Sequence, residues 1–395
     1  MIDITNKQDC VGCNACTQRC PTSCISMQED DEGFLYPCVD QSMCIHCGLC
    51  EKVCPVIHQA LPGEPINTFA AKNMNDSIRR KSSSGGVFHA LACNVINEGG
   101  VVFGARFDSK WGVEHSYTET ISGLAFFQGS KYVQSNIGTA YTDAERFLKA
   151  GRKVLFSGTP CQLAGLRLFL RKDYGNLLLS VDVACHGVPS PAVWQAYLAG
   201  LLDKIVKHGS LAMESITKID FRDIRHGWND YGFSISGKSK PGQADNVLFY
   251  ERRVNNLFMR GFLADLYLRP SCHECPAKCG KSKSDITLAD YWGIDRIHPS
   301  FYDKLGVSLV LANSANGLEA LSQCSLTMEK SSYNQAVTAN PALVRNARRP
   351  EQADIFMRSF QEKGIQCLPT ILSRMKPSLL IRIIRKARRM FARNR

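Results

Sequence analysis

The sequence contains no run of hydrophobic residues that approaches the roughly 18 needed to span a bilayer. Its start, MIDITNKQDC, has no basic region followed by an apolar region, which excludes a secretory signal peptide. We therefore expect a cytoplasmic protein, in which closely spaced cysteines are more often metal ligands than disulfides. Collagen-like, low-complexity and wholly disordered chains are excluded, because 44% of the 395 residues are hydrophobic.

Two motifs that would name a partner are also missing. No GxGxxG fingerprint follows a strand-like run, so the sequence gives no support for NAD(P)H as a direct electron donor. No module for nucleic-acid recognition is present, and we expect no nucleic-acid partner.

Acidic residues are absent beyond Glu362, whereas ten Lys or Arg residues follow it. Without those ten, Lys and Arg outnumber Asp and Glu by only 38 to 36, so the excess positive charge belongs to the C-terminal end. We expect residues 346–395 to form a basic amphipathic helical tail, with the clearest helical pattern over residues 374–395. Such a helix suits peripheral contact with the anionic inner face of a membrane. A helix packed on the body or docked on a partner would give the same pattern.

Cysteine is the residue in excess, with 18 in the chain, and ten of these lie no further along it than Cys54. Eight of those ten follow the spacing C-x2-C-x2-C-x3-C-P, which occurs twice. The first set is Cys10, Cys13, Cys16 and Cys20, and the second is Cys44, Cys47, Cys50 and Cys54. A 4Fe-4S cluster needs four soft thiolates, and three can come from one tight loop at this spacing.

In ferredoxins with two clusters, the fourth cysteine of each run binds the other cluster. We therefore assign Cys10, Cys13, Cys16 and Cys54 to one cluster, and Cys44, Cys47, Cys50 and Cys20 to the second. A pair of zinc sites is the alternative, but zinc ribbons use two C-x2-C pairs with longer spacers. Residues 1–58 resemble a bacterial-type dicluster ferredoxin domain, and we place the domain at residues 1–60.

The remainder of the chain predicts an α/β body behind a linker at residues 61–68, which contains the punctuation LPGEP. The apolar runs VVFGARF, KVLFSG and LLLSVDVAC indicate buried strands that alternate with helical patterns. We divide this body into residues 69–200 and residues 201–345. The predicted fold class is α/β (α+β), with a dicluster ferredoxin-like domain followed by a flavin-binding reductase domain.

Three loops of the body carry candidate chemistry. Residues 82–86, SSSGG, precede a helical pattern and form a possible anion site, although serines also cap ordinary helices. Cys161 and Cys185 each follow a predicted strand, and Cys272 and Cys275 form a C-x2-C pair. A lone C-x2-C pair suits a zinc half-site or a redox dithiol. With Cys161 and Cys185 as partners, it predicts a third iron–sulfur cluster.

The motifs SSSGGVFHAL, GSKYVQSNIG, VLFSGTPCQLAGL, VACHGVPSP, FRDIRHGW, LRPSCHECP and SDITLADYWG occur in this order. They resemble the family of beta subunits of coenzyme F-420 hydrogenases and dehydrogenases, which includes 7-hydroxymethyl chlorophyll a reductase and bacterial members associated with surface polysaccharides. The resemblance implies an FAD-containing core with its own 4Fe-4S cluster.

Carried over residue by residue, the resemblance places that cluster on Cys161, Cys185, Cys272 and Cys275, with Cys279 as the competing ligand. It places FAD at Ser83, Ser84, Gly85, Gly86 and Lys131. In one departure, Ala289 replaces the glycine that family members usually have before Asp290.

The expected function is an oxidoreductase that takes electrons from a ferredoxin-like donor, through the clusters, to FAD and then to a small-molecule acceptor. The acceptor would be deazaflavin F-420 or a metabolite of polysaccharide synthesis. The alternative is an electron-transfer subunit that feeds a separate catalytic partner. His186 and Lys131 are the candidate catalytic residues. Arg222 and Arg225 are candidate clamps for an acidic substrate.

Overall fold

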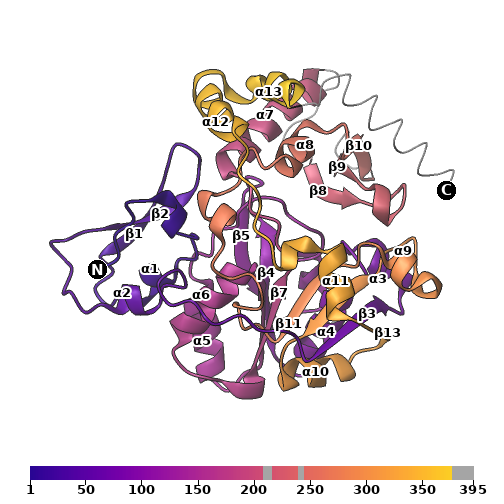
Figure 1. The fold of residues 1–395 in the computed structure, drawn as a ribbon, viewed down its shortest axis with the longest axis horizontal. Coiled ribbons are helices and arrows are strands. Elements are labelled where there is room, and N and C mark those ends of the chain that lie inside the picture. Colours follow the sequence, from indigo (N-terminus) through magenta and orange to yellow (C-terminus); the bar gives the residue numbers. More distant parts are fainter. Residues whose placement is uncertain (208–215, 239–243, 376–395) are drawn as a thin grey trace.

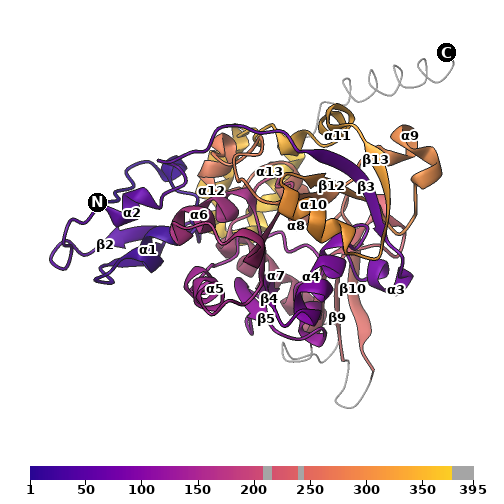
Figure 2. The ribbon, with the colours of Figure 1, turned by 90° about the horizontal axis from the view of Figure 1, so that it is seen from below.

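The N-terminal domain lies at one side of the molecule in the computed structural model, which describes residues 1–207, 216–238 and 244–375 (Figure 1). Strands β1 and β2 pair antiparallel, with Ile25 opposite Val39. The domain contains α1 (Ala15–Arg19), β1 (Ile25–Glu29), β2 (Leu35–Val39) and α2 (Leu49–Lys52). Seen from below, α1 lies beside α6 (Pro160–Leu170) of the body (Figure 2).

An eight-stranded mixed sheet forms the centre of the body, in the order β13-β3-β12-β11-β7-β6-β4-β5. Strands β11, β7, β6 and β4 run parallel, and the remaining neighbours pair antiparallel. The strands are β3 (Asn67–Asn73), β4 (Val101–Phe107), β5 (Val113–Thr118), β6 (Val154–Gly158), β7 (Leu178–Val183), β11 (Ile286–Asp290), β12 (Ser308–Ala312) and β13 (Leu326–Ser331). The runs VVFGARF, KVLFSG and LLLSVDVAC form β4, β6 and β7, as predicted, and the α/β class is confirmed.

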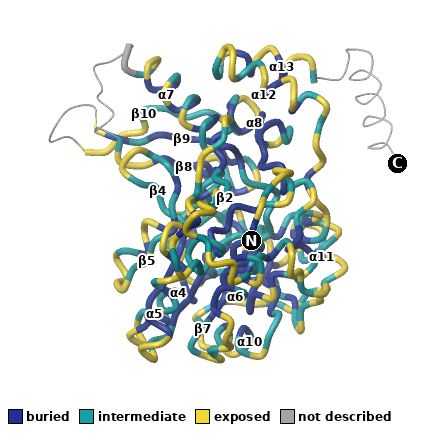
Figure 3. The backbone as a smooth tube through the Cα atoms, turned by 90° about the vertical axis from the view of Figure 1, so that its left-hand side faces the viewer, coloured by how far each residue is buried: buried dark blue, intermediate teal, exposed yellow. Residues whose placement is uncertain are grey.

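Helices cover both faces of this sheet, because side chains alternate between the faces along each strand. Val101 and Phe103 of β4 pack against α5 (Ala140–Lys149) and α6. Val102, between them, packs on the opposite face with α4 (Val87–Asn97) and α10 (Ala315–Ser322). Parallel strands covered on both faces have near-continuous apolar sequences, which explains why these runs identify themselves. The tube in Figure 3 shows the central strands mainly buried.

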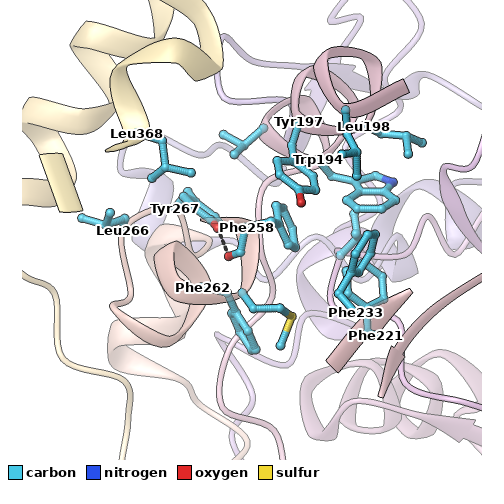
Figure 4. Close-up of a cluster of buried hydrophobic side chains, with 14 of the residues drawn as sticks. Trp194, Tyr197, Leu198, Phe221, Phe233, Phe258, Phe262, Leu266, Tyr267 and Leu368 are labelled. Carbon is cyan, nitrogen blue, oxygen red and sulfur yellow. Dashed lines mark hydrogen bonds between the residues drawn. The ribbon is translucent and has the colours of Figure 1, made fainter. Parts of the chain in front are cut away.

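A second core lies beyond the C-terminal ends of the parallel strands (Figure 1). Its aromatic centre includes Trp194, Phe221, Phe258 and Tyr267, and the Tyr267 hydroxyl donates a hydrogen bond to the Phe258 carbonyl (Figure 4). This core joins α7 (Pro191–Lys207), α8 (Leu257–Leu263), α12 (Gln352–Lys363), α13 (Leu368–Arg374) and the three-stranded sheet β10-β9-β8. Those strands are β8 (Ile216–Asp223), β9 (Gly232–Gly237) and β10 (Asn246–Arg252). The remaining short helices are α3 (Asp76–Arg80), α9 (Ile294–Ile297) and α11 (Tyr333–Ala339).

The segment boundaries in the structure differ from those predicted for the body and the tail. The division between residues 200 and 201 falls inside α7, because the apolar face of this helix continues past it into the second core. Residues 346–375 belong to the body, since Phe356 of α12 and Leu368 of α13 are fully buried in the same core. Residues 376–395, which hold most of the predicted amphipathic helix, lie outside the described residues. No helix of the described part is both long and apolar enough to cross a membrane.

Candidate functional site

Four thiols from both halves of the N-terminal repeat line one hollow of about 350 Å³. They are Cys10, Cys13, Cys16 and Cys54, the set assigned to the first cluster. Cys54 reaches the hollow from the second half of the repeat, as the exchange of fourth ligands requires. We call this hollow the first pocket.

A second hollow, of about 340 Å³, is lined by Cys20, Cys44, Cys47 and Cys50. This second pocket has an additional thiol, because the Sγ atoms of Cys20 and Cys24 are 3.4 Å apart. Burial alone would raise the pKa of Cys20, but hydrogen bonds from Thr22 and Cys24 outweigh burial and lower it to about 7. A low pKa favours the thiolate, which is the form that binds metal.

The backbones of the two cysteine loops repeat as closely as their sequences. Gly12 and Asn14 have left-handed φ angles of 68° and 58°, and His46 and Gly48, at the equivalent places in the second loop, have 53° and 69°. These paired bends turn three cysteines of each run towards one hollow. No three His, Cys, Asp or Glu side chains of the described residues are arranged around a single metal ion. The thiols instead surround spaces of the kind that a multi-atom cluster fills.

Cys161, Cys185, Cys272 and Cys275 form a third group, beyond the C-terminal ends of β6 and β7. Burial raises the pKa of the Cys161 thiol to about 12, and the nearby Cys275 and Cys185 thiols add to the increase. Burial likewise raises the pKa values of Cys185 and Cys272 to about 12, and both thiols lie near Cys275. A bound metal reverses this preference, because a coordinated thiol is deprotonated. We call this group the third thiol group.

Cys279 lies outside the third thiol group, although its spacing in the sequence allowed it to compete with Cys275. Its Sγ donates a hydrogen bond to the Val344 carbonyl at 3.5 Å, and its backbone has a left-handed φ of 59°. Its charge acts on Tyr333 of α11, whereas Cys161, Cys185 and Cys272 all respond to Cys275. The geometry therefore favours Cys275 as the fourth thiol.

The first pocket and the third thiol group meet across α6. Cys161 lies in the first turn of this helix, and Gly165 follows one turn later on the same side. A Cβ on Gly165 would lie 2.9 Å from the Cys13 Sγ. Tyr141, whose hydroxyl donates to the Gln162 carbonyl at 2.7 Å, lies near the thiols of both Cys13 and Cys161. One helix turn thus separates the two groups of cysteines.

The serines of the predicted flavin loop are occupied by contacts within the protein. Ser84 Oγ donates to the Val307 carbonyl at 2.9 Å, and Gly85 N donates to Ser308 Oγ at 2.9 Å. A Cβ on Gly85 would collide with the Ala71 carbonyl oxygen, so this glycine is required for close packing on the sheet. Gly86 caps α4 without a side-chain hydrogen bond, which leaves first-turn N–H groups free to bind an anion.

Lys131 lies near that loop, since its neighbour Ser130 shares a 2.8 Å hydrogen bond with Ser83. Its ammonium donates to the carbonyls of Gln128 and Gly129 at 3.1 and 3.2 Å. Burial lowers the pKa of Lys131 to about 8, and the charge of Asp220 opposes part of this effect. The ammonium has no salt bridge among the described residues, so an anionic group such as a diphosphate would find a cation and free N–H groups on adjacent loops. The residues present fit FAD in this respect.

His186, the other candidate catalytic residue, lies at the surface and contacts Asp265. Its Nε2 is 2.5 Å from Asp265 Oδ1, and its side chain is 41% exposed. The ring meets Phe262 edge-on at 5.4 Å, and Phe262 stacks on Tyr132 at 4.9 Å. Phe262 therefore separates His186 from the loop that carries Lys131, and the two candidates are not in direct contact.

Arg222 is not a free clamp for a substrate, contrary to the prediction, because Asp290 neutralises it. Its Nη1 lies 2.6 Å from Asp290 Oδ2 and its Nη2 lies 3.2 Å from Oδ1, in a nearly buried pair. Arg225 is similarly held by Asp223, with an Nη2–Oδ2 distance of 2.6 Å. Pairs of this kind form because a buried cation is costly without a hydrogen-bonded counter-charge.

Sequence reasoning missed the aromatic surroundings of Asp290. Trp228 Nε1 donates to Asp290 Oδ1 at 3.0 Å, and the Trp228 and Trp292 rings stack at 5.0 Å. Tyr291 is fully buried, so it acts as a core residue. The motif DITLAD followed by YWG marked this strand end as important, but it gave no signal for the partners from FRDIRHGW.

Comparison with known proteins agrees with this geometry. Residues 151–334 match the family that comprises the C terminus of the beta subunit of coenzyme F420 hydrogenase/dehydrogenase, and residues 9–57 match the 4Fe-4S dicluster domain. The chain belongs to the family of coenzyme F420 hydrogenase/dehydrogenase beta subunits. Its N-terminal ferredoxin domain and a redox role are therefore established at the level of the family.

Two curated relatives cover different parts of this family member. The F subunit of F(420)H(2) dehydrogenase from Methanosarcina mazei is 23% identical over 232 residues, which are 54% of this chain. Ferredoxin 7Fe of Hydrogenibacillus schlegelii is 35% identical over 71 residues, which are 17% of this chain. The chain spans 60% of the length of the dehydrogenase relative and 85% of that of the ferredoxin.

A solved structure is also similar, from the F420-reducing [NiFe] hydrogenase complex of Methanosarcina barkeri. The match covers 77% of this chain and 90% of that chain, with 17% identity and a TM-score of 0.45.

Proposed function

We propose that this chain is a redox subunit that binds three 4Fe-4S clusters and FAD and carries electrons from a ferredoxin-like donor to deazaflavin F420. The placement of α6 supports this proposal most directly, because the helix carries Cys161 of the third thiol group and packs on Cys13 of the first pocket. When bound, the clusters carry electrons singly, and FAD accepts them one at a time and releases two with a proton.

The chain would hold these groups at distinct positions. The first pocket and second pocket supply four thiolates each, and the third thiol group supplies four more. Lys131 and the first turn of α4 would hold the FAD diphosphate by charge and by backbone N–H groups. F420 is proposed as the acceptor because it appears in the name of the dehydrogenase relative. A polysaccharide-pathway acceptor stays a prediction of the sequence resemblance.

His186 is the residue that we propose to hold the proton. The carboxylate of Asp265 accepts from His186 Nε2 and would stabilise the charged ring. The exposed ring can exchange its proton with water, and it follows Cys185 directly in the chain. The side chain of Asp265 thus orients His186 without taking part in the transfer itself.

The second pocket supports a role for an external redox protein. Cys47 is exposed there, and its neighbours Met43 and Ile45 are 52% and 63% exposed. Exposed apolar side chains around a ligand cysteine give a partner a surface close to the bound group. This feature also favours the alternative function, in which a separate subunit rather than F420 takes the electrons.

Anaerobic purification of the full chain tests the cofactor set. We expect about twelve irons and one FAD per chain, whereas about eight irons would remove the third cluster. The reduced protein is then mixed with F420 alone, and the absorbance of F420 reports its reduction. If the clusters and flavin are reoxidised only after a second polypeptide is added, the chain is an electron-transfer subunit and F420 reduction belongs elsewhere.

A further inference from the structure

Arg269 places a fully buried positive charge between the N-terminal domain and the third thiol group. Its side chain has 0% exposure. The guanidinium donates to the Cys10 carbonyl at 2.8 Å, the Leu35 carbonyl at 3.0 Å and Gln134 Oε1 at 2.9 Å. All three acceptors are neutral, and no salt bridge to Arg269 occurs among the described residues.

The other end of the residue belongs to the third thiol group. The Arg269 carbonyl accepts a hydrogen bond from Cys272 N at 2.9 Å, at the start of the turn that carries Cys272 and Cys275. The charge of Arg269 also acts on the thiols of Cys161 and Cys272. The same side chain therefore touches the loop of the first pocket and influences the third thiol group.

The internal repeat shows that the first cysteine loop is shaped around this guanidinium. A Cβ on Gly12 would lie 2.8 Å from Arg269 Nη1. His46 occupies the equivalent position in the second loop with a similar left-handed φ, so the backbone alone does not require glycine there. The second pocket has no comparable arginine contact among the described residues. Gly12 is thus explained by the space that Arg269 takes.

Burying an unpaired cation is costly, by several kcal/mol for an isolated ion. The hydrogen bonds to neutral oxygens and the ring of Tyr36, whose centre is 4.3 Å from the guanidinium carbon, recover part of that cost. Anionic clusters at the first pocket and the third thiol group would supply the missing counter-charge on both sides. This inference rests on the proposed binding of clusters at these two places.

We propose that Arg269 is a positioning residue that raises the reduction potentials of the first and third clusters together and fixes the N-terminal domain against the third thiol group. A fixed cation favours the reduced, more negative state of a neighbouring cluster. Its charge does so most strongly here because water is excluded. The second cluster, which lacks this neighbour, serves as an internal reference.

The test is potentiometric titration of the full-length protein, purified anaerobically, with electron paramagnetic resonance resolving the cluster signals. In Arg269→Gln we expect the first and third clusters to become at least tenfold harder to reduce, a fall of about 59 mV for one electron. The second cluster should be unchanged. Arg269→Lys keeps the charge and should restore most of the difference.

Arg79→Gln provides the matched control. Arg79 is also buried, at 6% exposure, but it pairs with Asp76 at 2.5 Å and Asp303 at 2.7 Å. Its removal should leave all three potentials unchanged. Equal shifts of all three clusters in Arg269→Gln, or no shift, would overturn the proposal.

Loss of iron is read separately. If Arg269→Gln does not retain the first and third clusters, Arg269→Lys decides, and loss of both clusters there too would overturn a role for charge. If the wild type contains only about eight irons, the third cluster of the proposed function is wrong. The first cluster is then still compared with the second in the same titration.

Discussion

Cys13 lies directly against Gly165 of α6, so that a Cβ on the glycine would be 2.9 Å from Sγ and 3.0 Å from Cβ of the cysteine. It would also lie 3.2 Å from the Tyr141 hydroxyl. The absence of a side chain at this position is what allows the N-terminal domain to pack on the helix that carries Cys161. Gly165 is therefore a structural requirement of the interface between the first pocket and the third thiol group.

Gly165→Ala should separate these two parts of the protein. The added methyl group overlaps buried atoms that cannot move freely, and overpacking of this kind costs about 1–3 kcal/mol. We expect a lower unfolding midpoint in urea and less iron in the first pocket. Both are measured on the purified full chain, by fluorescence and by iron analysis.

Gly200→Ala is the control for this substitution. Gly200 also lies within a helix, α7, but its nearest neighbour to a new Cβ would be Ile365 Cγ2 at an ordinary 3.7 Å. Alanine there should leave the protein as stable or stabilise it by up to about 1 kcal/mol. If the two alanine variants lose stability equally, the close contact between Cys13 and Gly165 does not limit the interface.

Cys275→Ser and Cys279→Ser should separate the two competing ligands of the third cluster. The thiol of Cys275 acts on all three other members of the third thiol group, whereas Cys279 donates to the Val344 carbonyl. We expect Cys275→Ser to reduce iron from about twelve to about eight per chain, and Cys279→Ser to keep it. Iron analysis together with the cluster signals decides between them, and iron loss in Cys279→Ser alone would reverse the assignment.

Features that are written in neighbouring residues could be predicted from the sequence. Strand β4 is legible because VVFGARF is buried on both faces of the sheet. The placement of Cys54 beside Cys10 is likewise legible, because the repeated cysteine spacing indicates two similar loops that exchange their fourth thiols. Local spacing and apolar runs determine both features, so no knowledge of the tertiary structure was needed.

Contacts between distant segments could not be predicted in this way. Arg269 meets Cys10 across 259 positions of the sequence, and nothing near either residue announces the other. Arg222 looked like a substrate clamp because its partner Asp290 lies 68 positions away. The residues of α12 and α13 looked like part of a tail, because the apolar faces that bury Phe356 and Leu368 are completed by α7 and α8.

His115 should make the protein less stable in acid. Burial lowers the pKa of His115 to about 4, with Ser157 opposing and Lys131 adding to the effect. Its Nε2 donates to the Ser157 carbonyl at 3.0 Å, and Ser135 Oγ donates to Nδ1 at 2.9 Å. The neutral ring is favoured in the folded state, so its stabilisation is complete above pH 6.5 and is lost as pH falls towards 4.

His115→Gln removes this titration while keeping a donor and an acceptor. Between pH 7.5 and 5 the wild type should lose about 2 kcal/mol through His115, and the variant should not. Urea unfolding at the two pH values measures the difference. A variant with the same pH slope as the wild type would show that His115 does not titrate in this range.

Asp182 should have the opposite pH dependence. Its side chain is 2% exposed and its Oδ1 has no hydrogen-bond partner among the described residues. Burial raises the pKa of Asp182 to about 6, although the nearby hydroxyls of Ser282 and Thr287 oppose the increase. The folded state therefore favours the protonated acid, and stability falls as pH rises from 3.8 towards 6.

Asp182→Asn removes the charge that causes this loss. We expect the variant to be more stable than the wild type by about 3 kcal/mol at pH 8 and by about half as much at pH 5. His115→Gln gains its advantage at pH 5 instead, so the two variants should change places as the pH is raised. Urea unfolding of both at pH 5 and pH 8 checks this crossing. An Asp182→Asn protein that is less stable at pH 8 would mean that the carboxylate, with a bound cation or water, is needed in its charged form.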